Sequence, residues 1–159
     1  MNAEDVKRYV CATFDGVDPL GSPNGDTFFI YDPGRDLPPE RQMPFATVVT
    51  GDHYDTVSAL DLQDAFRLNI GLTKATYTAL FGTPPTQRDE HYVLATGVDY
   101  AAVDTLMPHP YYASQYWVSI IDPGEENWRR AQELLAEAHA FAARKFANRK
   151  TRQASRPKR

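Results

Sequence analysis

The chain has 159 residues, a formal net charge of −4 and 42% hydrophobic residues, a composition that suits one domain with a single core of ordinary size. No stretch approaches the roughly 18 to 20 apolar residues of a membrane-spanning helix, and the first residues carry acids where a signal peptide is basic and then apolar, so we expect a cytoplasmic protein that does not engage a membrane. Cys11 is the only cysteine, which excludes an internal disulfide and a cysteine-based zinc site, and we expect it to fill the core from the first helix.

Charge is divided unevenly along the chain. Residues 144–159 contain eight Lys or Arg and no acid, whereas residues 1–143 contain nine Lys or Arg and all 21 acids, so the two parts carry +8 and −12. A basic end attracts phosphate backbones or acidic surfaces, but cations also complement the dipole at the end of a terminal helix, which is the simpler interpretation. We therefore divide the chain into a single domain, residues 1–148, and a basic C-terminal tail, residues 149–159.

The periodicity of the apolar residues predicts an α+β domain with the order α-β-β-β-α-β-β-α. Helices are indicated by apolar residues three and four positions apart, and strands by alternation of apolar and polar residues. The expected elements cover residues 3–14, 27–32, 45–50, 65–72, 74–81, 105–109, 116–122 and 123–148. This order is typical of two layers, in which about five mainly antiparallel strands form a sheet and the helices pack on one of its faces.

Alternation within the strands assigns aromatic and polar side chains to the sheet face that points away from the helices. We expect this outer face to carry Phe29, Tyr31, Arg67, Asn69, Trp117 and Ser119. Aromatic rings beside an arginine are suited to stacking nucleobases or holding a ligand. A second copy of the chain or a covering loop explains the same residues without a ligand, and a wrong assignment of faces is the third alternative.

The closing helix has the clearest local signal in the chain. Asp122, Pro123 and Glu125 have the spacing of an N-cap, a first helical residue and a reciprocal capping partner. A core-facing stripe follows at Trp128, Ala131, Leu135, Ala138, Ala142 and Phe146. We expect a long helix that continues to about residue 148.

Several of these segments carry a resemblance to known proteins. The stretches GDTFFIYDP, PFATVVT, FRLNIG and DTLMPHPYYASQYWVSIIDPGE, with the closing helix, resemble a bacterial family of uncharacterised proteins known only as a domain of unknown function, over nearly the whole chain. More distantly, the Trp-Val strand and the closing helix resemble the MmcQ/YjbR-like proteins. That resemblance implies an antiparallel sheet with helices on one side, and a DNA-binding role has been suggested for the group by fold comparison. Neither resemblance implies a catalytic residue.

The residues with reactive side chains form no motif for catalysis or metal binding. His53, His91, His109 and His139 lack the spacing of paired metal ligands, and no nucleophile or nucleotide-binding motif occurs, so we predict no metal, no cofactor and no catalytic residue. His109 lies between two prolines in an extended segment near the Trp117 strand, which suits either the wall of a pocket or a purely structural role.

These observations favour a binding or interaction module over an enzyme. The first hypothesis is association with nucleic acid or an acidic partner through Arg149, Lys150, Arg152, Arg156, Lys158 and Arg159. The second is a small-molecule binder or enzyme whose pocket, between sheet and loops, is lined by Tyr31, Arg67 and His109. The third is a structural subunit that forms a homodimer through the outer face of the sheet.

Overall fold

The computed structural model describes the backbone of residues 1–155 and the side chains of residues 1–151. Within this part of the chain, six antiparallel strands form one sheet in the order β1-β2-β3-β4-β6-β5. The strands are β1 (Val17–Gly21), β2 (Thr27–Tyr31), β3 (Pro44–Val49), β4 (Arg67–Gly71), β5 (Met107–Pro108) and β6 (Trp117–Ile121). The helices are α1 (Ala3–Thr13), α2 (Leu60–Gln63), α3 (Lys74–Phe81) and α4 (Glu125–Ser155), with single helical turns at Pro39–Arg41 and Ala113–Gln115.

The predicted α+β class is confirmed, with one strand more than expected. Strand β1 lies in the stretch whose Gly, Pro and Asn residues indicate turns, and it contains Pro19. Because β1 is the edge strand and pairs only with β2, a residue without an N–H group is tolerated there. Strand β5 is the opposite edge and is cut short at Pro108, as the prolines of that segment predict.

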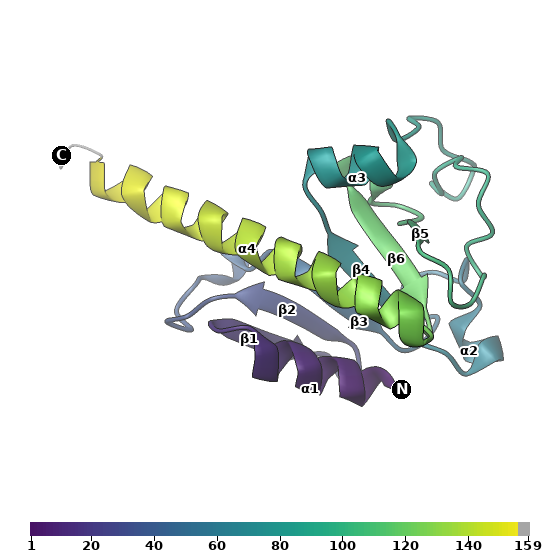
Figure 1. Ribbon diagram of the computed structural model, residues 1–159, viewed down its shortest axis with the longest axis horizontal. Helices are drawn as coiled ribbons and strands as arrows, with labels where there is room; N and C mark the ends of the chain where they lie inside the picture. Colours follow the sequence, from purple (N-terminus) through teal and green to yellow (C-terminus); the bar gives the residue numbers. More distant parts are fainter. Residues whose placement is uncertain (156–159) are drawn as a thin grey trace.

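One face of the sheet is covered by α1 and α4. Figure 1 shows α4 crossing the sheet and continuing past it toward the C-terminus. The core between these layers contains Leu68 and Ile70 from β4, Val118 from β6, Val10 from α1 and Leu135 from α4, each with no exposed surface. The predicted stripe of α4 is therefore the one that packs on the sheet.

The ends of α4 differ from the prediction. Asp122 is not its N-cap, because the backbone of Asp122 has a φ of 42° and its carboxylate accepts a hydrogen bond from the Phe66 N–H at 3.0 Å. The helix begins at Glu125, and it runs to Ser155 instead of stopping near residue 148. Among the described residues, no helix combines the length and apolar character needed to cross a membrane.

Cys11 is exposed, so the prediction that it fills the core is wrong. The buried face of α1 is formed by Val6 and Val10, which lie four positions apart. Successive residues of a helix are rotated by about 100°, so the residue after Val10 points away from that face.

The two faces of β2 are the reverse of the prediction. Phe29 is fully buried in the core on the helix side, and the Tyr31 ring packs edge-on against His139 and Phe146 of α4 at 5.3 Å each. Phe28 pairs with Thr47 of β3 and points to the other face. Alternation separates these residues correctly, but Phe29 and Ile30 are both buried, so hydrophobicity alone does not tell which set faces the helices.

Candidate functional site

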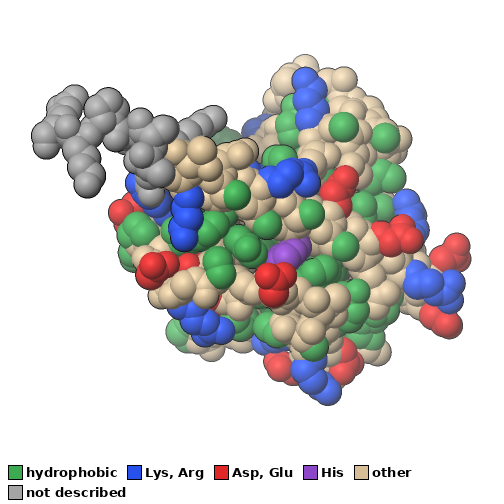
Figure 2. Space-filling view, turned by 60° about the vertical axis from the view of Figure 1, so that its left-hand side comes forward, with side chains coloured by type: hydrophobic (Ala, Val, Ile, Leu, Met, Phe, Trp, Pro, Cys, Tyr) green, Lys and Arg blue, Asp and Glu red, His purple; other side chains and the backbone are tan. Residues whose placement is uncertain are grey.

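A cleft of about 1110 Å³ lies at the end of the sheet where β3 begins and β4 ends. Its inner end rests on the sheet face that points away from the helices, where Thr47, Arg67 and Asn69 line it. Its outer end passes around the ends of these two strands and reaches Phe141 and Phe146 of α4. Figure 2 shows Lys and Arg side chains beside hydrophobic surface on the left of that view.

Loops cover much of this second face. Val49, Leu60, Ala65, Met107 and Ile121 form a small apolar cluster there, which occupies the part of the face near the end of β6. Arg67, Asn69 and Ser119 are consequently almost without exposed surface, at 3%, 2% and 0%. The face is therefore the loop-covered alternative of the sequence prediction, with a cleft left at one end.

Arg67 is held by the loop that follows β3. Its guanidinium makes two hydrogen bonds to the Asp55 carboxylate, at 3.3 and 3.1 Å, and one to the Ser58 hydroxyl at 2.9 Å. The Arg67 and Asp55 side chains are only 4% and 11% exposed, so this is a buried, charge-assisted pair. Nε of Arg67, which takes no part in these bonds, is buried and has no hydrogen-bond partner in the described chain.

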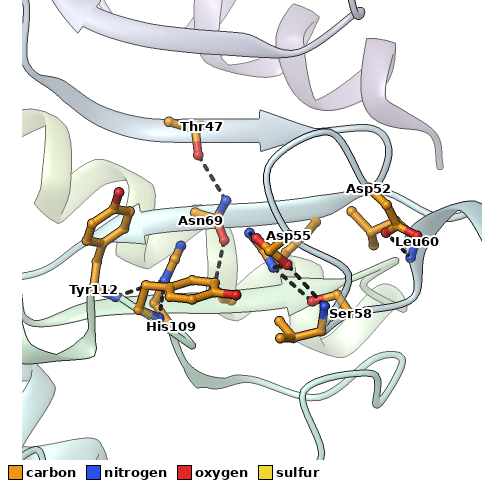
Figure 3. A network of polar contacts seen from close by, with 12 residues as sticks. Thr47, Asp52, Asp55, Ser58, Leu60, Asn69, His109 and Tyr112 are labelled. Carbon is orange, nitrogen blue, oxygen red and sulfur yellow. Dashed lines mark hydrogen bonds and ion pairs between the residues drawn. The ribbon is translucent and has the colours of Figure 1, made fainter. Parts of the chain in front are cut away.

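A second set of polar contacts crosses three neighbouring strands. The Asn69 amide donates to the Thr47 hydroxyl at 3.0 Å, and the Ser119 hydroxyl donates to the Asn69 carbonyl at 2.7 Å. Figure 3 shows Asn69 on its strand with Thr47 on one side and the segment that carries His109 on the other. These bonds fix the orientation of the amide.

His109 is buried in its neutral form at the inner end of the cleft. Its Nδ1 accepts hydrogen bonds from the backbone N–H groups of Tyr111 and Tyr112, both at 3.0 Å. Burial, helped by the positive charge of Arg67, lowers the pKa of His109 well below its ordinary value. Because Nδ1 is an acceptor, the single proton of the neutral ring is assigned to Nε2.

Aromatic side chains flank these polar groups. The Phe28 ring meets Tyr54 edge-on at 6.5 Å, and Tyr112 lies 4.9 Å from the His109 ring. Trp117 occupies the space above Gly71, where an added Cβ would lie 2.9 Å from the indole ring. A glycine at that position is what lets the indole lie against β4 and form part of the cleft wall.

The rim of the cleft is basic. We use "basic rim" for Arg41, Lys74, Lys145, Arg149 and Lys150. In total, six Lys or Arg and two Asp line the cleft, a balance of +4, in a chain whose net charge is −4. The Lys145 and Lys150 ammonium groups lie over Phe141 and Phe146, at 4.2 and 5.0 Å from the ring centres. Partial desolvation of this otherwise exposed side chain, and then the neighbouring Arg149, lower the pKa of Lys145.

Only some of the residues that the sequence assigned to the outer face of the sheet lie together at the cleft. Arg67, Asn69, His109 and Trp117 line the cleft, and Ser119 supports it through Asn69. Phe29 is in the core on the helix side, and Tyr31 lines the cleft from that side, so their assignment to the outer face was wrong.

Sequence reasoning missed Thr47, Asp55, Ser58 and Tyr112. Thr47 had a signal, because it is a polar residue within a β-branched strand. Asp55 had no such signal, because the sequence does not distinguish a loop acid that pairs with a distant arginine from an acid that is exposed to solvent.

The predicted tail residues fall into two groups. Arg149 and Lys150 are exposed on α4 and belong to the basic rim. Arg152 is on α4, but its side chain is outside the described part, and Arg156, Lys158 and Arg159 lie outside the described residues. Within the described chain, no three His, Cys, Asp or Glu side chains are grouped so that they could hold a metal ion.

Comparison with known proteins gives a family match. The model of a family described as "Family of unknown function (DUF6194)" matches residues 1–151. A search of curated proteins found no match, and a search of solved structures found none. The more distant likeness to MmcQ/YjbR-like proteins therefore stays a prediction.

Removing one partner of the buried Arg67–Asp55 ion pair is expected to lower the stability of the fold. Arg67→Met leaves the Asp55 carboxylate buried without its cation, and we expect a loss of about 3–5 kcal/mol of unfolding free energy in urea denaturation. The double variant Arg67→Met/Asp55→Leu is expected to recover most of this loss. Arg129→Met is the control, because its ion pair with Glu125 is exposed and worth about 0.5 kcal/mol or less. Equal losses for Arg67→Met and Arg129→Met would contradict this assignment.

The buried neutral His109 predicts a specific dependence of stability on pH. Its native pKa lies below the ordinary 6.5, so the unfolded chain takes up a proton below that pH while the native protein does not. The stabilisation is complete above pH 6.5 and is lost as the pH falls below it, by up to about 1.4 kcal/mol per pH unit. His109→Asn, whose Oδ1 can replace Nδ1 as the acceptor, should lack this part of the slope.

The measurement is urea unfolding of the two proteins between about pH 7.5 and about pH 5.5. Subtracting the curves removes the contribution of all other titrating groups. Identical slopes below pH 6.5 would show that His109 is not held neutral in the native state.

Proposed function

The chain belongs to the DUF6194 family, whose description assigns no function, and we propose from the geometry of the cleft that the protein binds a small organic anion. The observation that carries the proposal is a basic rim around a cleft of about 1110 Å³ in a chain of net negative charge. Cations gathered at a concave site raise the local concentration of anions against the charge of the rest of the surface.

The lining of the cleft supports a small molecule as the ligand. Ligand sites are typically concave and mostly apolar, with a few polar groups that set the orientation. Here Phe28, Trp117 and Phe146 supply apolar wall, while Arg67 and Asn69 supply fixed polar groups at the inner end. The hydrogen bonds that hold those two residues are made within the protein, so the site is organised before a ligand arrives.

The same contacts favour binding over catalysis. The Asp55 carboxylate is engaged by Arg67, and Nδ1 of His109 already accepts two backbone hydrogen bonds. A general base needs a free lone pair within reach of the substrate. Nδ1 of His109 has no lone pair to offer, and the Asp55 carboxylate is held in place by its pair with Arg67.

Charge reversal at the rim tests the proposal. Lys145→Glu/Arg149→Glu places two acids beside the cleft, and we expect aromatic carboxylates, sulfonates and phosphate monoesters to bind about tenfold more weakly, as measured by calorimetry. The matched control is Arg129→Glu/Arg130→Glu, which makes the same change of charge at exposed positions of α4 away from the cleft. Failure of wild-type protein to bind any of the three anion classes, or an equal loss in the control, would overturn the proposal.

A second candidate function has its own supporting observation. From Ala138 onward the chain contains no acid, and Arg144, Lys145, Arg149 and Lys150 are exposed on α4. The last turns of this helix continue past the sheet (Figure 1). A helix with one sign of charge is suited to the phosphate backbone of a nucleic acid.

A salt titration separates this second function from the first. If α4 binds duplex DNA, affinity should fall steeply with salt, and removal of residues 149–159 should flatten the slope by about 0.9 for each lost phosphate contact. Fluorescence anisotropy with a labelled duplex measures both. Unchanged binding by the truncated protein, or binding that does not respond to salt, would exclude the nucleic-acid interpretation.

A further inference from the structure

Two N–H donors at the inner end of the cleft are left without an acceptor. Nε of Arg67 is buried and unpartnered in the described chain. The proton on Nε2 of His109 makes no hydrogen bond within that same part of the chain, because the contacts of the ring run through Nδ1. The two donors differ in access: Arg67 Nε has almost no accessible surface, whereas Nε2 of His109 keeps some surface on a residue that lines the cleft, so a ligand in the cleft can accept from Nε2.

The inner end of the cleft is close to electrically neutral. The charge of Arg67 is balanced by Asp55 at 3.1 Å, and His109 carries no charge while Nδ1 is an acceptor. The basic rim, by contrast, has five cations against Asp36. The two ends of the cleft therefore select different chemical groups.

Resting on the proposed function, we infer that the ligand places a neutral carbonyl oxygen against His109 Nε2, beside Arg67, and its anionic group at the basic rim. A carbonyl oxygen accepts from the Nε2 proton without bringing a charge to the inner end of the cleft. An anion at the inner end would lose its hydration without meeting a net opposing charge. At the rim, an anion keeps contact with water and meets several cations.

The walls between the two ends indicate what joins these groups. Phe28 and Trp117 are half-buried, and Tyr112 lies beside His109 at the inner end. Flat aromatic side chains favour a planar, unsaturated ligand that stacks against them. The ligand class is therefore an aromatic or conjugated carbonyl compound that carries a carboxylate, sulfonate or phosphate at its far end.

Matched pairs of probes test this orientation of the ligand in the cleft. Fluorenone carboxylate and fluorene carboxylate share a ring system and an anionic group and differ in one ring carbonyl, and anthraquinone sulfonate and anthracene sulfonate form a second pair. We expect the carbonyl member of each pair to bind wild-type protein about tenfold more tightly, as measured by calorimetry. Reversal of the rim charges, Lys145→Glu/Arg149→Glu, should weaken both members alike.

Two substitutions of His109 separate its role toward the ligand from its role in the fold. His109→Asn keeps an acceptor near the position of Nδ1 for the Tyr111 and Tyr112 N–H groups but removes the donor at Nε2. It should abolish the preference for the carbonyl probe, so that the two members of each pair bind with equal affinity. His109→Gln places an amide N–H near the position of Nε2, so it should keep the preference even though it lowers stability.

The outcomes distinguish this inference from the proposed function. Equal affinity of wild-type protein for both members of each pair would overturn the inference and leave anion binding intact. Retention of the preference in His109→Asn would overturn the role of His109. Binding of none of the four probes would overturn the inference together with the proposed function.

Discussion

The buried pair of Arg67 and Asp55 is the constraint on which the second face of the sheet depends. An arginine in a central strand cannot stay buried without a counter-charge, since desolvation of an unpaired guanidinium costs several kcal/mol. Asp55 supplies that charge from the loop after β3, and Ser58 adds a third hydrogen bond. The pair ties the loop over one end of the face and leaves the other end as a cleft. The Arg67–Asp55 pair thus determines both where the loop lies and which end of the cleft is close to neutral.

Helix α4 links the core to the cleft. Its first half closes the core through Ala131, Leu135 and Ala138, and its later turns carry Lys145 and Arg149 to the rim. A single straight element therefore fixes the distance between the hydrophobic layer and the cations. The same cations are part of the basic stretch suited to nucleic acid, so the two proposed functions share residues and would compete for them.

Local pattern predicted much of the fold and about half of the site. In β4, alternation placed Arg67 and Asn69 on the face opposite Leu68, and pairing with β6 brought Ser119 to the same side. Strand β1 was missed because Pro19 is a strong turn signal that an edge strand tolerates. The faces of β2 were inverted because this strand is buried on both sides, which removes the contrast that alternation depends on.

What the sequence by itself determined is periodic and local: the α+β class, the long closing helix, the separation of charge, and which side chains of a strand share a face. Only the tertiary structure decided which face receives the helices, and which distant groups meet. Asp55 reaches Arg67 across 12 positions and Ser119 reaches Asn69 across 50. Such contacts depend on the path of loops between strands. Those paths are set by burial and charge pairing in the whole domain, for which a short stretch of residues carries no signal.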